Sequence, residues 1–213
     1  MACSLNGTGF MVSDELIRKI GWNTRSLTED LEFTALCALN GYKVGWMPRA
    51  RAFDEQTRFF RDSCVQRRRW TAGSLQCMRR YTGSLIRKHT AASLDMAALF
   101  LGNLLCIVGL IPAIVPIADL WPVLAKRPPW LPLAVVGLLG TGALYYLACC
   151  LAAALLYRAE GRLTRRSLPG IFGFPLFLVS WMPINLYACV TPPPKWRMIG
   201  HTRKISIKDV REA

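Results

Sequence analysis

Thr28, Glu29 and Asp30 form a triplet whose side chains are suited to acid–base chemistry. Thr28 is a good helix N-cap, and the two carboxylates after it would lie in the first helical turn, where the helix dipole favours negative charge. A carboxylate held there can accept the proton of an attacking hydroxyl as a general base. Simple helix capping explains the same three residues, so local physics leaves both interpretations open.

A second cluster, Gln-Arg-Arg-Arg-Trp at residues 66–70, has side chains suited to binding an anion and a sugar. An arginine guanidinium binds phosphate through two parallel hydrogen bonds. A tryptophan offers a flat apolar face on which a sugar ring can stack. A basic stretch beside a membrane with an interfacial tryptophan is the alternative interpretation.

Both clusters fall within residues 1–90, which we expect to be mixed α/β. The pattern predicts, in order, a strand within 4–12, a helix from Ser13 to Gly21, a helix from Thr28 to Asn40, a strand over 42–47 and a helix over 56–80. Capping residues and terminal glycines support the first two helices.

Three long runs without a charged residue follow, at 96–118, 128–157 and 167–194. A helix as long as the first run would extend roughly 35 Å, more than the roughly 30 Å hydrocarbon core of a bilayer. Buried core helices are the alternative, but charges interrupt them more often. We therefore predict an α-helical transmembrane region over 91–194, with membrane segments at about 96–118, 131–157 and 168–191.

The net charge of +14 limits the classes of partner. Lysine and arginine beside membrane segments stay on the cytosolic side, next to anionic lipid. No nucleic-acid motif accompanies them, so we expect no nucleic-acid partner. An anionic substrate, such as a nucleotide diphosphate, is a further interpretation of this charge.

The positive-inside rule orients the segments. The loop 158–166 has four arginines, whereas the loop 118–127 has only Lys126 and Arg127, so we expect 158–166 to be cytosolic. Residues 1–10 lack the features of a signal peptide, and we expect 1–90 to be cytosolic too. These expectations describe a multi-pass protein of a bacterial-type plasma membrane.

The third run leaves two topologies open. Pro169, Pro175 and Pro183 interrupt it, and proline kinks or breaks helices. If the run is kinked or re-entrant, the basic tail 195–213 stays in the cytosol. If the run crosses fully, the tail lies outside. We favour the cytosolic tail.

Taken together, the Thr-Glu-Asp triplet at 28–30, the Gln-x-x-Arg-Trp pattern at 66–70 and the membrane runs resemble the family 2 glycosyltransferases. They are most similar to the processive, membrane-embedded branch that includes cellulose, hyaluronan, chitin and poly-N-acetylglucosamine synthases. The segment from Asn6 to Phe10 is similar to the small-residue strand beside the acceptor in that family. The resemblance covers about residues 4–90, and over the membrane runs it is one of pattern only.

The resemblance implies the C-terminal part of a GT-A-type domain, with inverting transfer from a nucleotide-diphosphate sugar (a UDP-sugar) to a growing polysaccharide or a glycolipid. It makes Asp30 the general base. It implies supporting roles for seven further residues: Thr28 and Glu29 position the base, Gly7 and Thr8 shape the acceptor site, Gln66 and Arg69 face the donor diphosphate, and Trp70 stacks on the acceptor sugar.

The tail carries a looser similarity. Trp196, Thr202 and Arg203 resemble a segment found near the nucleotide in some of these synthases. A basic membrane-flanking tail is the alternative interpretation.

The family's metal ligands are missing from this sequence. The family holds Mg²⁺ or Mn²⁺ with an Asp-x-Asp motif in its nucleotide-binding half, and the chain has no such motif. It has eight cysteines but no Cys-x-x-Cys pair, so we expect no zinc site. We therefore expect an acceptor-side part at 1–90 that is inactive alone, as a C-terminal fragment, a truncated reading frame or one part of a split enzyme whose N-terminal half is the partner. The alternatives are a non-enzymatic membrane module, a truncated relic that lacks the donor site, and a lipid- or polyanion-binding anchor.

Overall fold

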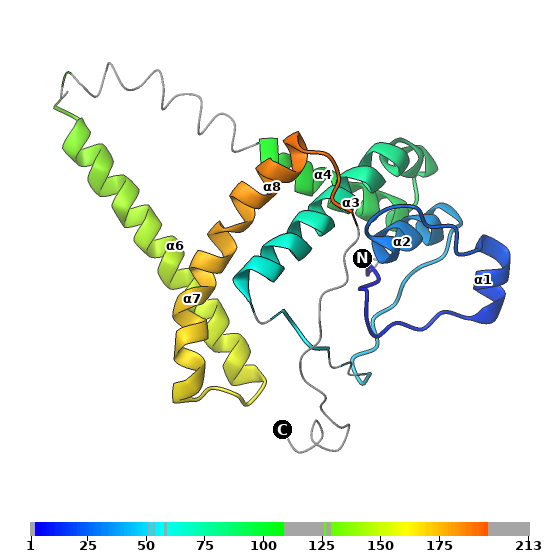
Figure 1. The fold of residues 1–213 in the computed structure, drawn as a ribbon, viewed down its shortest axis with the longest axis horizontal. Helices are drawn as coiled ribbons and strands as arrows, with labels where there is room; N and C mark the ends of the chain where they lie inside the picture. Colours follow the sequence, from blue (N-terminus) through cyan, green and yellow to red (C-terminus); the bar gives the residue numbers. More distant parts are fainter. Residues whose placement is uncertain are drawn as a thin grey trace. The chain divides into compact units, whose positions relative to one another are not determined.

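The computed structural model describes residues 3–50, 52, 54–57, 59–108, 126 and 129–195 (Figure 1). The chain divides into two compact units, of which the first comprises 1–106 with 184–213 and the second comprises 107–183.

The first unit opens with helix α1 (Asp14–Ile20), whose two ends have the predicted caps. The Ser13 hydroxyl accepts a hydrogen bond from the Leu16 amide at 3.3 Å. Gly21 ends the helix at φ 74°, a left-handed value that glycine adopts without a Cβ clash. The prediction of this helix from its capping residues is confirmed.

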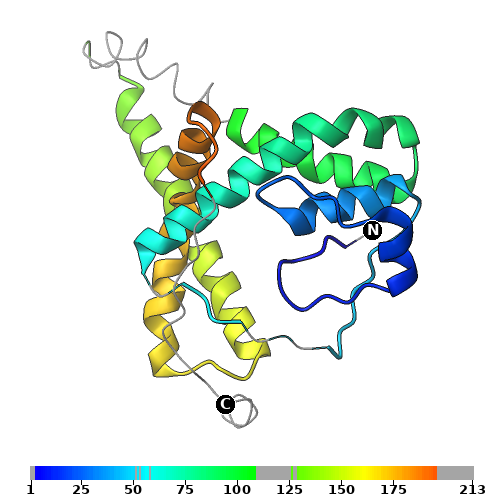
Figure 2. The ribbon, with the colours of Figure 1, turned by 45° about the vertical axis from the view of Figure 1, so that its right-hand side comes forward.

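Helices α2 (Glu29–Leu39), α3 (Phe60–Lys88) and α4 (Ala91–Val108) build the core of the first unit. They lie side by side in both views of the ribbon (Figures 1 and 2). The buried apolar cluster takes side chains from all three helices: Ala35, Ala38, Cys77, Leu85, Ala92, Met96, Ala97 and Phe100. This core packs the second half of α2 against α3 and α4.

The prediction of two β-strands is wrong for the described residues. Within the residues that the structure describes, 4–12 and 42–47 contain no β-strand. A backbone hydrogen bond from the Cys3 amide, just before the first segment, reaches the Val44 carbonyl of the second at 3.1 Å. A strand exists only through a ladder of such bonds, which these segments do not form. The α/β expectation for residues 1–90 is therefore not shown, and their described secondary structure is helical.

Helix α3 is longer than the predicted 56–80. It begins at Phe60 and continues to Lys88, where His89 ends it in a left-handed conformation with φ 53°. Leu85 has no solvent exposure, because it packs into the core of the first unit. This burial carries the helix past Gly83, which in isolation weakens a helix.

The second unit is built on α6 (Leu131–Ala159), a 3₁₀ turn η1 (Arg165–Ser167) and α7 (Leu168–Val179). Cys150, Ala153 and Ile171 form its buried cluster. The Tyr146 hydroxyl donates to the Phe172 carbonyl at 2.9 Å and joins α6 to α7.

The third apolar run is interrupted, as its prolines predicted. Helix α7 ends at Val179, and α8 (Trp181–Val190) begins after Ser180. Pro183 lies in the first turn of α8, where its missing amide is tolerated, and it cannot donate to the Val179 carbonyl four residues earlier. The break therefore falls one turn before this proline, while Pro175 lies inside α7.

Two described helical segments, 131–159 and 165–190, are long and apolar enough to cross a membrane. In the most apolar 18-residue stretch of each segment, only 6% and 17% is buried, whereas the core helices of a soluble protein are mostly buried. This exposure suggests association with a membrane. The predicted segment 96–118 is described only as far as Val108, and its remainder lies outside the described residues.

Candidate functional site

The candidate site is centred on the first turn of α2. Thr28 occupies the N-cap position, yet its side chain makes no capping hydrogen bond. Its hydroxyl oxygen instead lies 3.9 Å from the Cys77 sulfur of α3. Asp30 takes over the capping function, because its Oδ1 accepts the Leu31 amide at 2.8 Å. The capping interpretation therefore applies to Asp30, and it does not exclude a chemical role.

Asp30 has the electrostatic setting of a base. Burial raises the pKa of its carboxyl, and the neighbouring Glu29 carboxylate raises it further. The Leu31 amide and the positive charge of Arg69 offset part of this increase. An ionised carboxylate with a raised pKa takes a proton more readily than an ordinary aspartate does.

Gly7 lies directly against this carboxylate. A Cβ placed on Gly7 would be 3.6 Å from Oδ2 of Asp30, which is ordinary van der Waals contact. The extended segment that contains Gly7 therefore passes close to the carboxylate. The structure thus brings together Gly7, Asp30 and Arg69, three residues that the sequence assigned to one site.

One face of α3 holds the residues just before α2. Arg69 Nη1 donates to the Leu27 carbonyl at 2.9 Å, and Gln76 Oε1 accepts the Leu27 amide at 3.1 Å. Between them, a Cβ on Gly73 would lie 2.6 Å from the Thr28 side chain and 2.8 Å from the Thr28 amide nitrogen. Positions 69, 73 and 76 share one helix face, so α3 holds the start of α2 along a continuous line.

The three consecutive arginines of α3 have three different surroundings. Arg67 is buried, with its guanidinium over the Phe60 ring and its Nε donating to the Ser63 carbonyl at 3.3 Å. Arg68 donates to the Thr191 hydroxyl at 3.1 Å and lies over the Tyr187 ring at 4.7 Å. Arg69 contacts the loop leading into α2.

The remaining predicted site residues are partly or fully exposed, or lie outside the described residues. Gln66 is half-buried and Trp70 is 38% exposed, and the spacing makes Gln66 a same-face neighbour of Arg69 and of Trp70, whereas Trp70 itself turns away from Arg69. Thr8 and Glu29 are exposed. Trp196, Thr202 and Arg203 lie outside the described residues.

Sequence reasoning missed Glu32, which is fully buried on α2. Its Oε2 accepts the Arg25 and Ser26 amides at 2.7 and 2.6 Å, and its Oε1 accepts the Tyr81 hydroxyl at 2.6 Å. Burial opposes ionisation, but these hydrogen bonds outweigh it and lower the pKa of the Glu32 carboxyl. The available signal was a carboxylate on the helix face that also carries Phe33 and Ala35.

The described residues do not fit a metal site for the donor. Among them, no group of three or more histidine, cysteine, aspartate or glutamate side chains is arranged to hold an ion. A Mg²⁺ or Mn²⁺ site needs several oxygen ligands close together, which this part of the chain does not supply.

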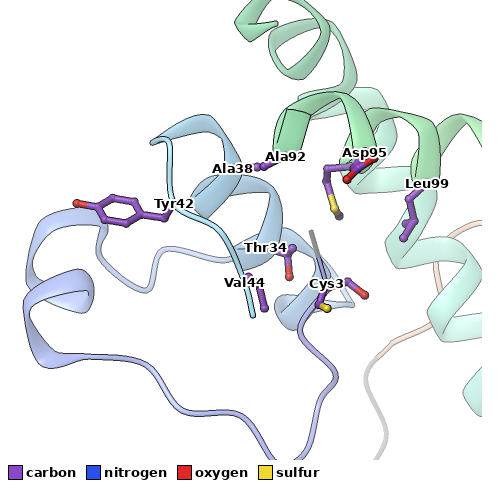
Figure 3. Close-up of a pocket in the computed structure, with 10 residues that line it drawn as sticks. Cys3, Thr34, Ala38, Tyr42, Val44, Ala92, Asp95 and Leu99 are labelled. Carbon is purple, nitrogen blue, oxygen red and sulfur yellow. The ribbon is translucent and has the colours of Figure 1, made fainter. Parts of the chain in front are cut away.

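A small pocket in the first unit lies at a different place (Figure 3). Its lining residues include Thr34 of α2, Val44 of the extended segment 42–47, and Asp95 and Met96 of α4. Asp30, Arg69 and Trp70 are not among them. The candidate site is therefore defined by side-chain arrangement at the α2–α3 contact.

Comparison with known proteins shows the family. The glycosyl transferase family group 2 matches residues 1–160 of the 213, and the chain therefore belongs to that family. Its members transfer a sugar from a nucleotide-sugar donor to an acceptor. The match includes both the 28–30 triplet and the 66–70 cluster.

A stretch of 75 residues is 29% identical to the uncharacterized glycosyltransferase YaiP of Escherichia coli (strain K12). The stretch covers 35% of this chain and 19% of that relative, so the chain matches about a fifth of the relative's length. No solved structure matches the chain.

Proposed function

We propose that the chain carries the acceptor side of an inverting glycosyl transfer, with Asp30 as the general base. The observation that supports this most strongly is the setting of Asp30 at the start of α2. Its carboxylate is partly buried, has a raised pKa, lies next to Gly7 and interacts electrostatically with Arg69. Thr28 and Glu29 precede it at the start of the helix, and we assign them a positioning role.

The reaction is a single displacement. The acceptor hydroxyl gives its proton to Asp30, and its oxygen attacks the anomeric carbon of the donor sugar. The bond from that carbon to the diphosphate oxygen breaks, and the nucleoside diphosphate leaves with the bonding electrons. Attack from the opposite face inverts the configuration of the anomeric carbon.

Substrate contacts follow from the face that α3 turns to α2. Arg69 has five N–H donors, and its bond to the Leu27 carbonyl uses one of them. The guanidinium therefore retains donors for the diphosphate of a UDP-sugar, with Gln66 one turn earlier. Trp70 offers its ring to the acceptor sugar. Gly7 and Thr8 line the acceptor path.

The apolar helices give the acceptor a membrane setting. We propose a multi-pass protein of a bacterial-type plasma membrane, with residues 1–90 and the basic tail in the cytosol. A growing polysaccharide or a glycolipid would then be extended beside the bilayer, and membrane lipids would surround 131–159 and 165–190. Trp196, Thr202 and Arg203 would approach the nucleotide from the tail.

The donor side of the reaction needs further groups. We propose that Mg²⁺ or Mn²⁺ and the nucleotide-binding residues come from a partner region outside the described residues. The test must therefore use the protein in its native membranes.

Labelled sugar transfer in such membranes tests the proposal. Membranes from cells carrying the gene, from a deletion strain and from the deletion strain with the gene restored are incubated with a panel of labelled nucleotide sugars. We expect one donor to label lipid-extractable or polymeric product only where the gene is present. Equal labelling in all three membranes would contradict the proposed function and favour a non-enzymatic module.

A further inference from the structure

Glu32 is a carboxylate without solvent exposure, two residues after Asp30 on the same helix. A buried charge is unfavourable unless hydrogen bonds compensate it. The hydrogen bonds that compensate the Glu32 charge come from two groups, the loop before α2 and helix α3. Glu32 therefore holds these two groups in place.

The first of these groups is the loop that enters α2. Glu32 Oε2 accepts the amides of Arg25 and Ser26 at 2.7 and 2.6 Å. Both amides precede the helix, so the side chain folds back over its own N-terminus. Hydrogen bonds to an ionised acceptor are stronger than neutral ones.

The second group is α3. Glu32 Oε1 accepts the Tyr81 hydroxyl at 2.6 Å, and Arg80 Nη1 lies 3.8 Å from the same oxygen. Tyr81 is 49 residues away in sequence. Glu32 therefore joins the entering loop of α2 to the helix that carries Arg69.

The loop has additional hydrogen bonds between its fixed ends. The Ser26 hydroxyl donates to the Thr28 carbonyl at 3.0 Å, and both polar backbone groups of Leu27 are bound by α3. Residues 25–28 are therefore hydrogen-bonded at every position. Only Glu29 separates Asp30 from this segment, so the position of the segment determines the position of the Asp30 carboxylate.

We propose that Glu32 is a positioning residue, which fixes the 25–28 loop and thereby places the Asp30 carboxylate for proton transfer. Its full burial removes it from direct contact with substrate, so its effect passes through the loop. The inference rests on the proposed function of Asp30.

The test combines hydrogen exchange with kinetics. Exchange at residues 24–31 is measured by mass spectrometry on the purified full chain in detergent, and transfer is measured in native membranes. Tyr81→Phe removes one hydroxyl from Glu32 and keeps the ring. Tyr42→Phe removes a hydroxyl just beyond the other end of α2 and serves as the matched control. Glu32→Ala and Glu32→Gln complete the set.

We expect Tyr81→Phe and Glu32→Ala to accelerate exchange at residues 25 and 26 and to lower kcat roughly 5- to 30-fold. The donor KM should stay unchanged, because Glu32 does not contact the donor. Glu32→Gln should recover most of kcat, since its amide oxygen can still accept the two loop amides. Tyr42→Phe should match the unaltered protein.

Two results would overturn the inference. Unchanged exchange in Tyr81→Phe and Glu32→Ala would show that Glu32 does not hold the loop. Faster exchange with an unchanged kcat would show that the loop does not position the base. Absence of transfer in unaltered membranes would instead overturn the proposed function, and the catalytic part of this inference with it.

Discussion

Asp30 and Glu32 lie two residues apart on α2, and the structure shifts their pKa values in opposite directions. Burial raises the pKa of Asp30, whereas hydrogen bonds from the loop and from Tyr81 outweigh burial and lower that of Glu32. The shift at Asp30 favours proton uptake by the carboxylate that we propose as the base. The carboxylate that holds the backbone stays ionised at neutral pH, which keeps its hydrogen bonds strong.

A substitution at Arg69 distinguishes specific binding of the donor diphosphate from a general effect of positive charge. Arg69→Lys keeps the positive charge but loses the planar fork that binds a diphosphate through two bonds. We expect kcat/KM for the nucleotide sugar to fall roughly 10- to 100-fold. Steady-state transfer in native membranes measures it.

Arg87→Lys is the matched control, because Arg87 is exposed in the last turn of the same helix. It should leave transfer unchanged. If Arg69→Lys behaved like this control, the 66–70 cluster would act as a general basic surface, as expected of an anchor that binds lipid or polyanion.

At the scale of elements, the site depends on a close approach between α2 and α3. Gly73 permits this approach, because a Cβ there would come within 3.0 Å of both the side chain and the backbone of Thr28. Sequence patterns located α1 and α2 well, since the Ser13 cap, the apolar spacing and the terminal glycines act locally, although Thr28 makes no capping hydrogen bond. They could not show this contact, which joins residues far apart in the sequence.

The difference between local signals and contacts distant in sequence also explains the predictions that were wrong or incomplete. The two strands were wrong for the described residues, because a strand is stabilised by its neighbours and the bond described here joins Val44 to Cys3, just before the first segment. The length of α3 was underestimated because Leu85 gains its stability from the core. Glu32 was missed because Tyr81, its partner, is distant in sequence.

Gly73→Ala and Gly83→Ala on α3 test the close approach. In an open helix interior, glycine to alanine stabilises by up to about 1 kcal/mol, and Gly83 has nothing within 4 Å of an added Cβ. We expect Gly83→Ala to stabilise and Gly73→Ala to destabilise by about 1–3 kcal/mol through overpacking. Thermal unfolding in detergent compares the two. A stabilising Gly73→Ala would exclude the described contact.

At the scale of the whole molecule, the chain combines a helical unit that carries the site with helices whose apolar side chains are exposed. The central part of α6 includes Leu144, which is 68% exposed, so water is an unfavourable surrounding for this helix. The comparisons show membership of a glycosyltransferase family, and the exposed apolar surface suggests association with a membrane. The sequence predicted both features, because family motifs and long apolar runs are readable without tertiary contacts.

Leu144→Arg tests the membrane setting of α6. An arginine near the centre of a spanning helix costs about 2.5–3.5 kcal/mol in insertion, so less protein should resist alkaline extraction from membranes. Leu163→Arg, in the loop after α6, should leave extraction unchanged. Equal extraction of both variants would show that α6 does not lie in the bilayer.

The central claim is that Asp30 is the base, and the pH dependence of transfer in native membranes tests it most directly. The base must be ionised, so kcat/KM should rise with pH through a pKa above the ordinary aspartate value of 3.8. Asp30→Asn should lower kcat roughly 10²- to 10⁴-fold and remove that rise, while the exposed control Glu15→Gln should preserve both. Full activity in Asp30→Asn, with the acidic limb of the profile intact, would contradict the account.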